Sequence, residues 1–330
     1  MNKQVTLAAR PVGFPKESDF ALVETETPKP GPGEVLVRSQ YLSVDPYQRG
    51  RMSEARSYAK PVQIGEVMTA QGAGEVVESN DPRFAPGDQV VGTLGWQEYA
   101  AVPGGTIRKI PDGVPLQASL HVLGTNGLTA YFGLYDVAQA KPGDTVVVSA
   151  AHGAVGQVVG QLAKIAGCRA VGIAGGPDKV RELTELFGYD AAIDYKNEDV
   201  SAGLKEACPG GIDVYFDNVG GEITDAVMRR LALRARIAVC GQISHYNATE
   251  QPVGPRHLAA LIVSRARVEG FLINDFIPRF GEAIPRLAQW LAEGKLRYTE
   301  DIVEGIERTP EAFFRVLRGD NRGKQLVRLV

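Results

Sequence analysis

The chain has 330 residues, of which 44% are hydrophobic and 23% charged, with a formal net charge of −3. Its length is about twice that of a usual single domain, so we expect two domains with ample core. The charge balance and the lack of a dense basic run exclude an obvious nucleic-acid partner. No apolar run reaches the roughly 20 residues of a membrane span, and residues 1–10 lack a signal-peptide core. We expect no membrane association.

Cysteine and histidine usage indicates the compartment and argues against a metal site. Three scattered cysteines, an odd number, suit a reducing cytoplasm better than a disulfide framework. No histidine stands near a cysteine with ligand-like spacing, so we expect no zinc site. These residues are Cys168, Cys208, Cys240, His121, His152, His245 and His257.

The first 120 residues are β-rich. Strand patterns lie at 35–39, 72–78 and 96–102, and residues 84–92 hold a Pro-Gly-Asp turn that runs into a further strand. Closely spaced strands of this kind predict a compact barrel-like or sandwich unit rather than a doubly wound sheet.

Strand and helix patterns alternate over residues 121–297. Five or six strands joined by helical crossovers predict an α/β domain with a doubly wound parallel sheet, the Rossmann fold. The expected strands are 145–149, 170–174, 191–193, 212–217, 235–240 and 267–273, and the expected helices include 178–187, 198–207, 222–233 and 284–293. The strand-like tail at 324–330 has no obvious partner in this sheet. We therefore expect residues from about 298 to 330 to complete the N-terminal domain, which becomes discontinuous.

The first strand of the parallel sheet leads into a small-residue turn and then an apolar-periodic helix. The turn reads A-x-G-x-x-G, with Ala151 at the usual first glycine and Gly153 and Gly156 following. Unpaired N–H groups at a helix N-terminus attract an anion, and glycines let a pyrophosphate approach the backbone. The turn predicts a dinucleotide site.

The residues at the end of the second strand distinguish an NAD site from an NADP site. An NAD site usually offers a carboxylate there for the ribose 2′-hydroxyl. Here small residues at 174–177 are followed by Asp178 and Lys179. The lysine could pair with a 2′-phosphate. The aspartate fits the first turn of a helix, where the dipole favours a negative charge. NADP(H) is favoured over NAD(H), and the alternative is that Lys179 is an ordinary solvated lysine.

At these residues the chain resembles the zinc-free branch of the medium-chain dehydrogenase/reductase superfamily, and more narrowly its leukotriene B4 12-hydroxydehydrogenase/prostaglandin reductase group, which includes curcumin reductases and plant double-bond reductases. The resemblance covers nearly the whole chain. It rests on the segments 45–52, 127–134, 151–156, 217–221, 240–247 and 321–324. It implies a GroES-like substrate domain and a Rossmann domain that binds NADPH.

The resemblance also implies site residues. Lys179 and Tyr195 would bind the 2′-phosphate and Asn218 the adenosine side. The remaining cofactor-binding positions are Ala151, Gly153, Ala154, Val155, Gly156, Cys240, Gly241, Ile243, Ser244, Tyr246, Phe271, Leu272, Ile273 and Asn321. Three departures from the family pattern stand out. Gln48 replaces a common Met and could alter the substrate pocket, and Thr125 and Asn126 replace a common Met-Pro pair. His152 replaces a common Ala on the phosphate turn, residues 151–156.

Without a metal, the hydride acceptor must be polarised by hydrogen bonds. A C=C bond conjugated to a carbonyl suits this chemistry, because charge then collects on the carbonyl oxygen as an enolate. Tyr246 and Tyr47 are the candidate catalytic residues, and the α-carbon proton could come from water.

The resulting hypothesis is an NADPH-dependent ene-reductase acting on enones or enals, of the 2-alkenal reductase type. The alternatives are an NADPH quinone oxidoreductase and a non-catalytic NADP-binding sensor. By family analogy we expect a homodimer that pairs through strand 267–273.

Overall fold

The computed structural model describes residues 1–329, which divide into two compact units. Unit 1 contains Met1–His121 and the residues from Glu300 onward, and unit 2 is Val122–Thr299. Unit 2 holds the parallel sheet and unit 1 a separate β-rich sheet, which confirms the fold class expected from the sequence. No helix of the described chain is long and apolar enough to span a membrane.

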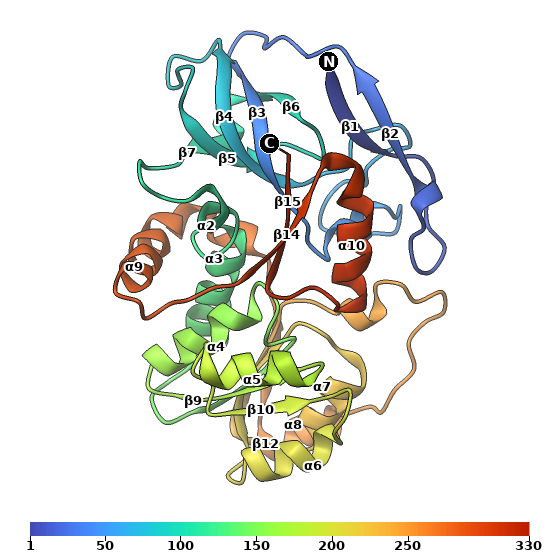
Figure 1. The fold of residues 1–330 in the computed structure, drawn as a ribbon. Helices are drawn as coiled ribbons and strands as arrows, with labels where there is room; N and C mark the ends of the chain where they lie inside the picture. Colours follow the sequence, from blue (N-terminus) through green and yellow to red (C-terminus); the bar gives the residue numbers. More distant parts are fainter. Residues whose placement is uncertain (330) are drawn as a thin grey trace. The chain divides into compact units, whose positions relative to one another are not determined.

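Unit 1 is built around a mixed sheet, antiparallel except for the parallel pair β14 and β15, that the C-terminal strand joins (Figure 1). That strand pairs antiparallel with β3, with Leu326 opposite Ser43. The sheet order is β14 (Glu300–Glu304), β15 (Lys324–Arg328), β3 (Glu34–Ser43), β4 (Gln71–Ser79), β5 (Gln89–Thr93) and β7 (Ile107–Lys109), with β6 (Tyr99–Pro103) also on β3. A separate pair is formed by β1 (Asn2–Leu7) and β2 (Phe20–Thr25), and the helices are α1 (Gln48–Arg51), α2 (Leu116–Leu120) and α10 (Thr309–Arg318), with 3-10 turns η1 (Glu17–Asp19), η2 (Gly104–Thr106) and η6 (Ile306–Arg308).

Aromatic residues hold α10 to the N-terminal part of unit 1. The helix is strongly amphipathic, and its Phe313 is completely buried. The Phe313 ring lies 5.8 Å from the Trp96 ring, which in turn lies 5.6 Å from Phe20. Trp96 was expected to begin a strand, but it precedes β6 and fills this core instead.

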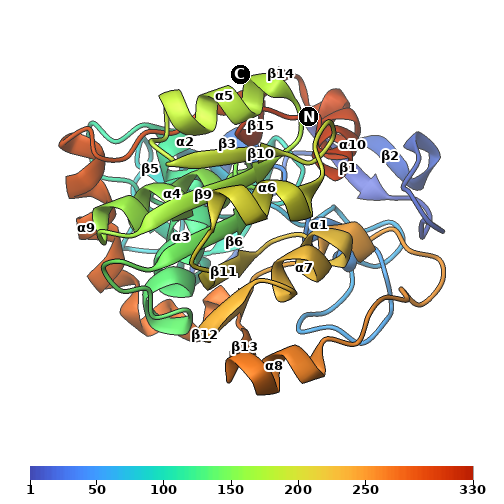
Figure 2. The same cartoon turned by 90° about the horizontal axis from the view of Figure 1, so that it is seen from below.

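Unit 2 contains a six-stranded parallel sheet in the order β10-β9-β8-β11-β12-β13 (Figure 2). Central strand residues such as Val147, Ile173 and Tyr215 are completely buried, as expected for a parallel sheet covered on both faces. The strands are β8 (Thr145–Ser149), β9 (Arg169–Ala174), β10 (Ala191–Asp194), β11 (Ile212–Asp217), β12 (Leu231–Val239) and β13 (Arg267–Gly270). The helices are α3 (Thr125–Phe132), α4 (Gly156–Ile165), α5 (Pro177–Glu185), α6 (Val200–Ala207), α7 (Gly221–Met228), α8 (Leu258–Ser264) and α9 (Phe280–Ala292), with a π-helical turn η3 (Gly133–Val137) and 3-10 turns η4 (Ile243–His245) and η5 (Ile273–Arg279).

Two element boundaries predicted from the sequence are wrong. The helix expected at 222–233 ends at Met228, because Leu231 pairs with Ile212 in the sheet and so starts β12. The strand expected at 267–273 ends at Gly270, after which Phe271 packs at 6.1 Å against Phe216. In both places the local sequence is compatible with more than one secondary structure, and tertiary packing determines which one forms.

Candidate cofactor and active site

The turn between β8 and α4 has the form of an anion cradle. Ala150 adopts a left-handed conformation, with φ of 47°, which reverses the chain after the strand. A Cβ on Gly156 would lie 2.4 Å from the Ala150 carbonyl oxygen, so the close approach of helix and turn requires glycine. Within the described chain, the N–H groups of Val155 and Gly156 donate to no protein acceptor. An anion at this helix N-terminus would find free donors and a favourable dipole.

Ala151, in place of the first glycine, packs inward. It is completely buried, and its N–H donates to the Ile173 carbonyl at 3.0 Å. A Cβ on Gly172 would come within 2.9 Å of the Ala151 methyl, so the alanine fills space beside β9. Gly153, Ala154 and Val155 remain partly exposed on the turn. These residues fit a pyrophosphate site formed mainly by backbone.

Two polar side chains, Tyr195 and Lys196, lie against the turn after β9, which leads to Lys179. Lys179 lies half-buried in the first turn of α5. A Cβ on Gly175 would lie 2.8 Å from the Tyr195 ring and 3.0 Å from Lys196 Cε. The structure therefore places Tyr195 and Lys196 over the turn that leads into α5. Lys196 was not predicted from the sequence, although its place after a strand end and next to Tyr195 was a usable signal.

The Asp194 carboxylate at this turn accepts hydrogen bonds from the backbone. Asp194, at the end of β10, is buried. Its Oδ1 accepts hydrogen bonds from the Gly176 N–H at 2.8 Å and the Lys196 N–H at 3.0 Å. Asp194 therefore fixes the shape of the turn.

Asp217, at the end of β11, organises the surrounding loops, and no role for it was predicted from the sequence. Its carboxylate is 1% exposed and receives six hydrogen bonds within the described chain. Charge-assisted bonds of this number hold the surrounding loops rigidly. The donors are Ser149 Oγ, Tyr215 OH, the N–H groups of Val219 and Gly220, Thr224 Oγ1 and Gln242 Nε2.

Asn218 continues this network toward the phosphate turn. Its N–H donates to Ser149 Oγ at 2.9 Å and its Nδ2 to the Ser149 carbonyl at 2.7 Å. Asn218 thus connects the end of β11 with the end of β8.

Hydrogen bonds to Asp217 also hold the segment 240–246. The N–H groups of Cys240 and Gly241 donate to the Asp217 carbonyl at 2.8 and 3.1 Å. The Tyr246 hydroxyl accepts from the Gln242 N–H at 3.4 Å, so the phenol folds back over its own loop. Ser244 Oγ donates to the Val219 carbonyl at 2.6 Å, and Ile243 N–H to that of Asn218 at 3.4 Å.

The surroundings of Cys240 determine the protonation state of its thiol. Burial, reinforced by the negative charge of Asp217, raises the pKa of the Cys240 thiol to about 12. The thiol is therefore protonated at neutral pH and is not a nucleophile.

The segment that follows β13 packs on η3. A Cβ on Gly133 would lie 2.5 Å from the Phe271 ring, so the glycine makes room for this aromatic side chain. Leu272 and Ile273 follow at the start of η5 and are half-buried.

In unit 1, the segment that carries Tyr47 is anchored by a buried ion pair. Lys324 is completely buried, and its Nζ donates to Asp45 Oδ1 at 2.5 Å and to the Val44 carbonyl at 3.2 Å. Ser43 Oγ bonds the other oxygen of Asp45. Asn321, nearby in sequence, closes its own turn by donating to the Gly323 carbonyl at 2.8 Å.

Tyr47 is a neutral phenol in this setting. Burial first, and then the Asp45 charge, raise the pKa of Tyr47 well above its ordinary value, although Arg51 opposes the shift. The Arg51 guanidinium lies 5.6 Å from the Tyr47 ring and 4.6 Å from the Tyr58 ring. Tyr47 can therefore donate a hydrogen bond throughout the physiological pH range.

Gln48 does not have the role expected for it. It is completely buried, and its amide is used by the backbone: Oε1 accepts from Asp45 N–H at 3.0 Å, while Nε2 donates to the Ser43 and Thr69 carbonyls at 3.1 and 3.0 Å. Gln48 therefore braces the Tyr47 segment rather than facing a substrate.

Glu300 should make stability depend on pH. It is the register partner of Lys324, and burial raises its pKa from 4.5 to about 7, with Lys324 opposing. The folded state thus holds a proton between about pH 4.5 and 7 that the unfolded state has lost, so this group's contribution to stability falls as pH rises through that window. After allowance for partial exposure, the loss is on the order of 1–2 kcal/mol.

Thermal unfolding from pH 4.5 to 8 measures this effect. Glu300→Gln should gain stability relative to the native protein as pH rises, whereas Glu307→Gln, at an exposed position, should not. An unchanged difference across the range would show that Glu300 titrates normally.

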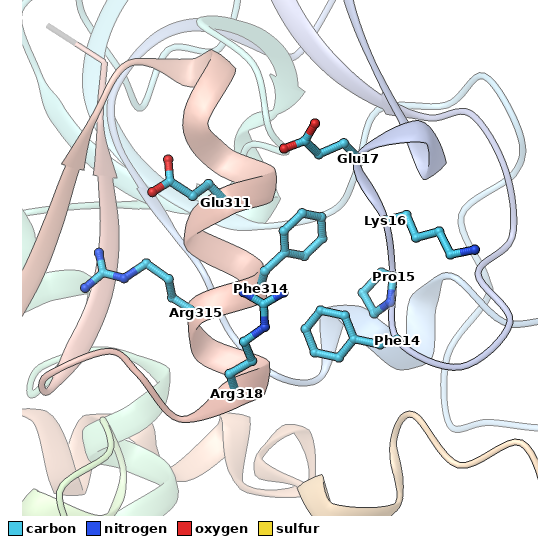
Figure 3. A pocket seen from close by; sticks show the side chains of 8 residues that line it. All are labelled: Phe14, Pro15, Lys16, Glu17, Glu311, Phe314, Arg315 and Arg318. Carbon is cyan, nitrogen blue, oxygen red and sulfur yellow. The ribbon is translucent and has the colours of Figure 1, made fainter. Parts of the chain in front are cut away.

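Unit 1 also has a shallow pocket of about 590 Å³ between residues 14–17 and α10 (Figure 3). Arg315 there pairs with Asp301 at 2.6 Å, and Arg318 lies over the Phe14 ring at 4.9 Å. None of the residues predicted for the site lines this pocket. Elsewhere, no three His, Cys, Asp or Glu side chains of residues 1–329 are grouped as metal ligands would be.

Comparison with known proteins identifies the family. Residues 3–110 match the N-terminal domain of oxidoreductases, and residues 154–291 match a family described as zinc-binding dehydrogenase. The NADPH-dependent curcumin reductase of Escherichia coli is 46% identical over 99% of this chain and 97% of its own, and the NADP(+)-dependent 2-alkenal reductase of Nicotiana tabacum is 45% identical over the same shares. The structure of CurA in complex with NADPH from Vibrio vulnificus is 46% identical, covers 99% of both chains and has a TM-score of 0.95.

The chain belongs to the medium-chain dehydrogenase/reductase superfamily. Within that superfamily it falls in the zinc-free group of curcumin, 2-alkenal and prostaglandin reductases, as the sequence landmarks predicted.

Proposed function

We propose that this protein is an NADPH-dependent ene-reductase that reduces the C=C bond of α,β-unsaturated ketones or aldehydes. The observation that carries the proposal is the basic turn of unit 2, where Lys196 and Tyr195 lie over Gly175 and Lys179 follows in α5. Its relatives named as NADPH-dependent curcumin reductase and 2-alkenal reductase support the same chemistry.

The described residues fit NADPH. The free N–H groups of Val155 and Gly156 would bind the pyrophosphate, and Lys179, Tyr195 and Lys196 the 2′-phosphate. The segments 240–246 and 271–273, together with Asn321, are the proposed nicotinamide-side residues. When bound, NADPH supplies the hydride.

The chain's own contribution is to stabilise developing charge. As the substrate carbonyl becomes an enolate, a positioned hydroxyl donates a stronger hydrogen bond to it than to the ground state. Tyr246 and Tyr47 are the proposed donors. The Asp217 network holds the Tyr246 loop, and the Asp45–Lys324 pair holds the Tyr47 segment, so each phenol is attached to a rigid support.

Tyr246→Phe should lower kcat for an enone by about 100- to 1,000-fold, the usual cost of one oxyanion donor. The KM for NADPH should stay within about twofold, because phenylalanine keeps the ring and the loop loses only the long bond from the Gln242 N–H, while Gln242 Nε2 still donates to Asp217. Steady-state kinetics measures both values. Tyr99→Phe, in β6, is the matched control and should behave like the native protein; an unaltered kcat in Tyr246→Phe would remove Tyr246 from the mechanism.

An NADPH-oxidation screen over enals, enones and quinones, with product identification, tests the function. Turnover of enones and enals to products that keep the carbonyl supports an ene-reductase. Turnover restricted to quinones would make the protein a quinone oxidoreductase, and tight NADPH binding without any turnover would make it a sensor.

We further infer a cytoplasmic homodimer that forms through the edge of the parallel sheet. The three cysteines are free thiols, which suits a reducing compartment. Strand β13 is the sheet edge, and Val268 on it is 46% exposed. The adjoining helix α8 exposes Leu258, Ile262 and Val263 by 73–78%. An exposed edge beside exposed apolar side chains is typical of an interface.

Ile262→Glu combined with Val268→Glu should convert the dimer to monomer, because like charges would be buried without a partner at the interface. Light scattering coupled to gel filtration gives the mass. Val253→Glu, at a 98% exposed position, is the control. A native protein that elutes as a monomer would refute this assembly.

A further inference from the structure

His152 occupies an unusual place on the phosphate turn. It is the residue between Ala151 and Gly153, yet its side chain is only 2% exposed. Its Nε2 lies 2.6 Å from Glu182 Oε2, and its ring packs edge-on against Phe187 at 5.7 Å. With the carboxylate ionised, Nε2 carries the proton and donates it to the bond. This partly buried hydrogen bond therefore connects the phosphate turn to α5.

Glu182 lies on α5 close to Lys179, the residue proposed to bind the 2′-phosphate of the cofactor. It stands three residues after Lys179, a spacing that places two Cβ atoms about 5–6 Å apart on one helix face. Asp178 and Glu185, the other acidic residues of the helix, both face Arg181, at 2.7 and 4.0 Å. Glu182 is thus the carboxylate whose orientation is controlled from the phosphate turn.

We propose that His152 is a specificity-determining positioning residue: by holding the Glu182 carboxylate against the phosphate turn, it keeps that negative charge from opposing a 2′-phosphate at Lys179. The inference rests on the proposed NADPH-binding role of Lys179. The ligand feature it discriminates is the phosphomonoester on the adenosine ribose.

The physical effect differs between the two cofactors. A released carboxylate would repel a dianionic 2′-phosphate and compete with it for the lysine ammonium. The 2′-hydroxyl of NADH can instead donate a hydrogen bond to a carboxylate, as in NAD-specific folds. Loss of His152 should therefore change the ratio of the two affinities, whereas general loosening of the turn would weaken both.

Calorimetric titration of NADPH, NADH and 2′,5′-ADP into the full chain tests this, without any need for turnover. His152→Ala should weaken NADPH and 2′,5′-ADP by about tenfold and leave NADH within about twofold, from the Coulomb energy of one nearby charge. Adding Glu182→Gln to His152→Ala should restore most of the NADPH affinity. His152→Gln, which keeps a donor for Glu182, should retain it as well.

Two results would overturn the inference. One is an equal loss for NADPH and NADH in His152→Ala; the other is a double variant that binds NADPH no better than His152→Ala. Thermal unfolding of each variant confirms that it is folded. A native protein that binds NADPH no tighter than NADH would overturn the proposed cofactor itself, which is a separate outcome.

Discussion

Replacing Lys324 with methionine should destabilise the protein by about 3–5 kcal/mol, the cost of leaving a buried charge without its partner. Asp45 loses the ammonium that its Oδ1 contacts at 2.5 Å, and the Val44 carbonyl loses a donor. Burial already lowers the pKa of Lys324, and Asp45 opposes that shift, so the cation persists only because its partner is present. Urea unfolding measures the free energy directly.

The matched control is Lys295→Met. Lys295 pairs with Glu293 at 2.8 Å, but both side chains are substantially exposed, so we expect a change of about 0–1 kcal/mol. Combining Asp45→Asn with Lys324→Met should recover part of the loss, because the unpaired charge is removed as well. Equal costs for Lys324→Met and Lys295→Met would show that the buried pair does not stabilise unit 1.

Lys179→Ala should weaken NADPH binding by about 10- to 100-fold, the value of charge-assisted hydrogen bonds to a phosphate. NADH, which has no 2′-phosphate, should bind within about twofold of its native affinity. Tyr195 and Lys196 at the same turn would keep some affinity, so the loss should not be complete. Titration calorimetry with both cofactors provides the comparison.

Lys205→Ala is the control for Lys179→Ala, since Lys205 is an exposed lysine on α6. It should leave both affinities unchanged. Equal losses for NADPH and NADH in Lys179→Ala would refute contact with the 2′-phosphate and would point instead to a disturbed α5.

The sequence was sufficient to predict the phosphate turn because its structure is set locally. A β-branched strand, small residues and an apolar-periodic helix follow one another within 16 residues, and the structure has β8, the turn and α4 in that order. The parallel order of the sheet followed from the alternation of strands and helices.

The missed features depend on contacts between residues far apart in sequence. Asp217 binds Ser149, 68 residues away, and Lys324 reaches Asp45 across 279 residues. Neither partner carries a local pattern that indicates burial. The same limit explains Gln48, whose amide binds the Thr69 carbonyl and not a substrate pocket.

The direct test of the proposed function is to follow the hydride. The protein is supplied with NADPH deuterated at the transferable position of nicotinamide C4 and with a simple enone, and the product is examined by NMR. We predict a saturated ketone with deuterium at the β-carbon. Deuterium on the carbinol carbon of an allylic alcohol would contradict the account.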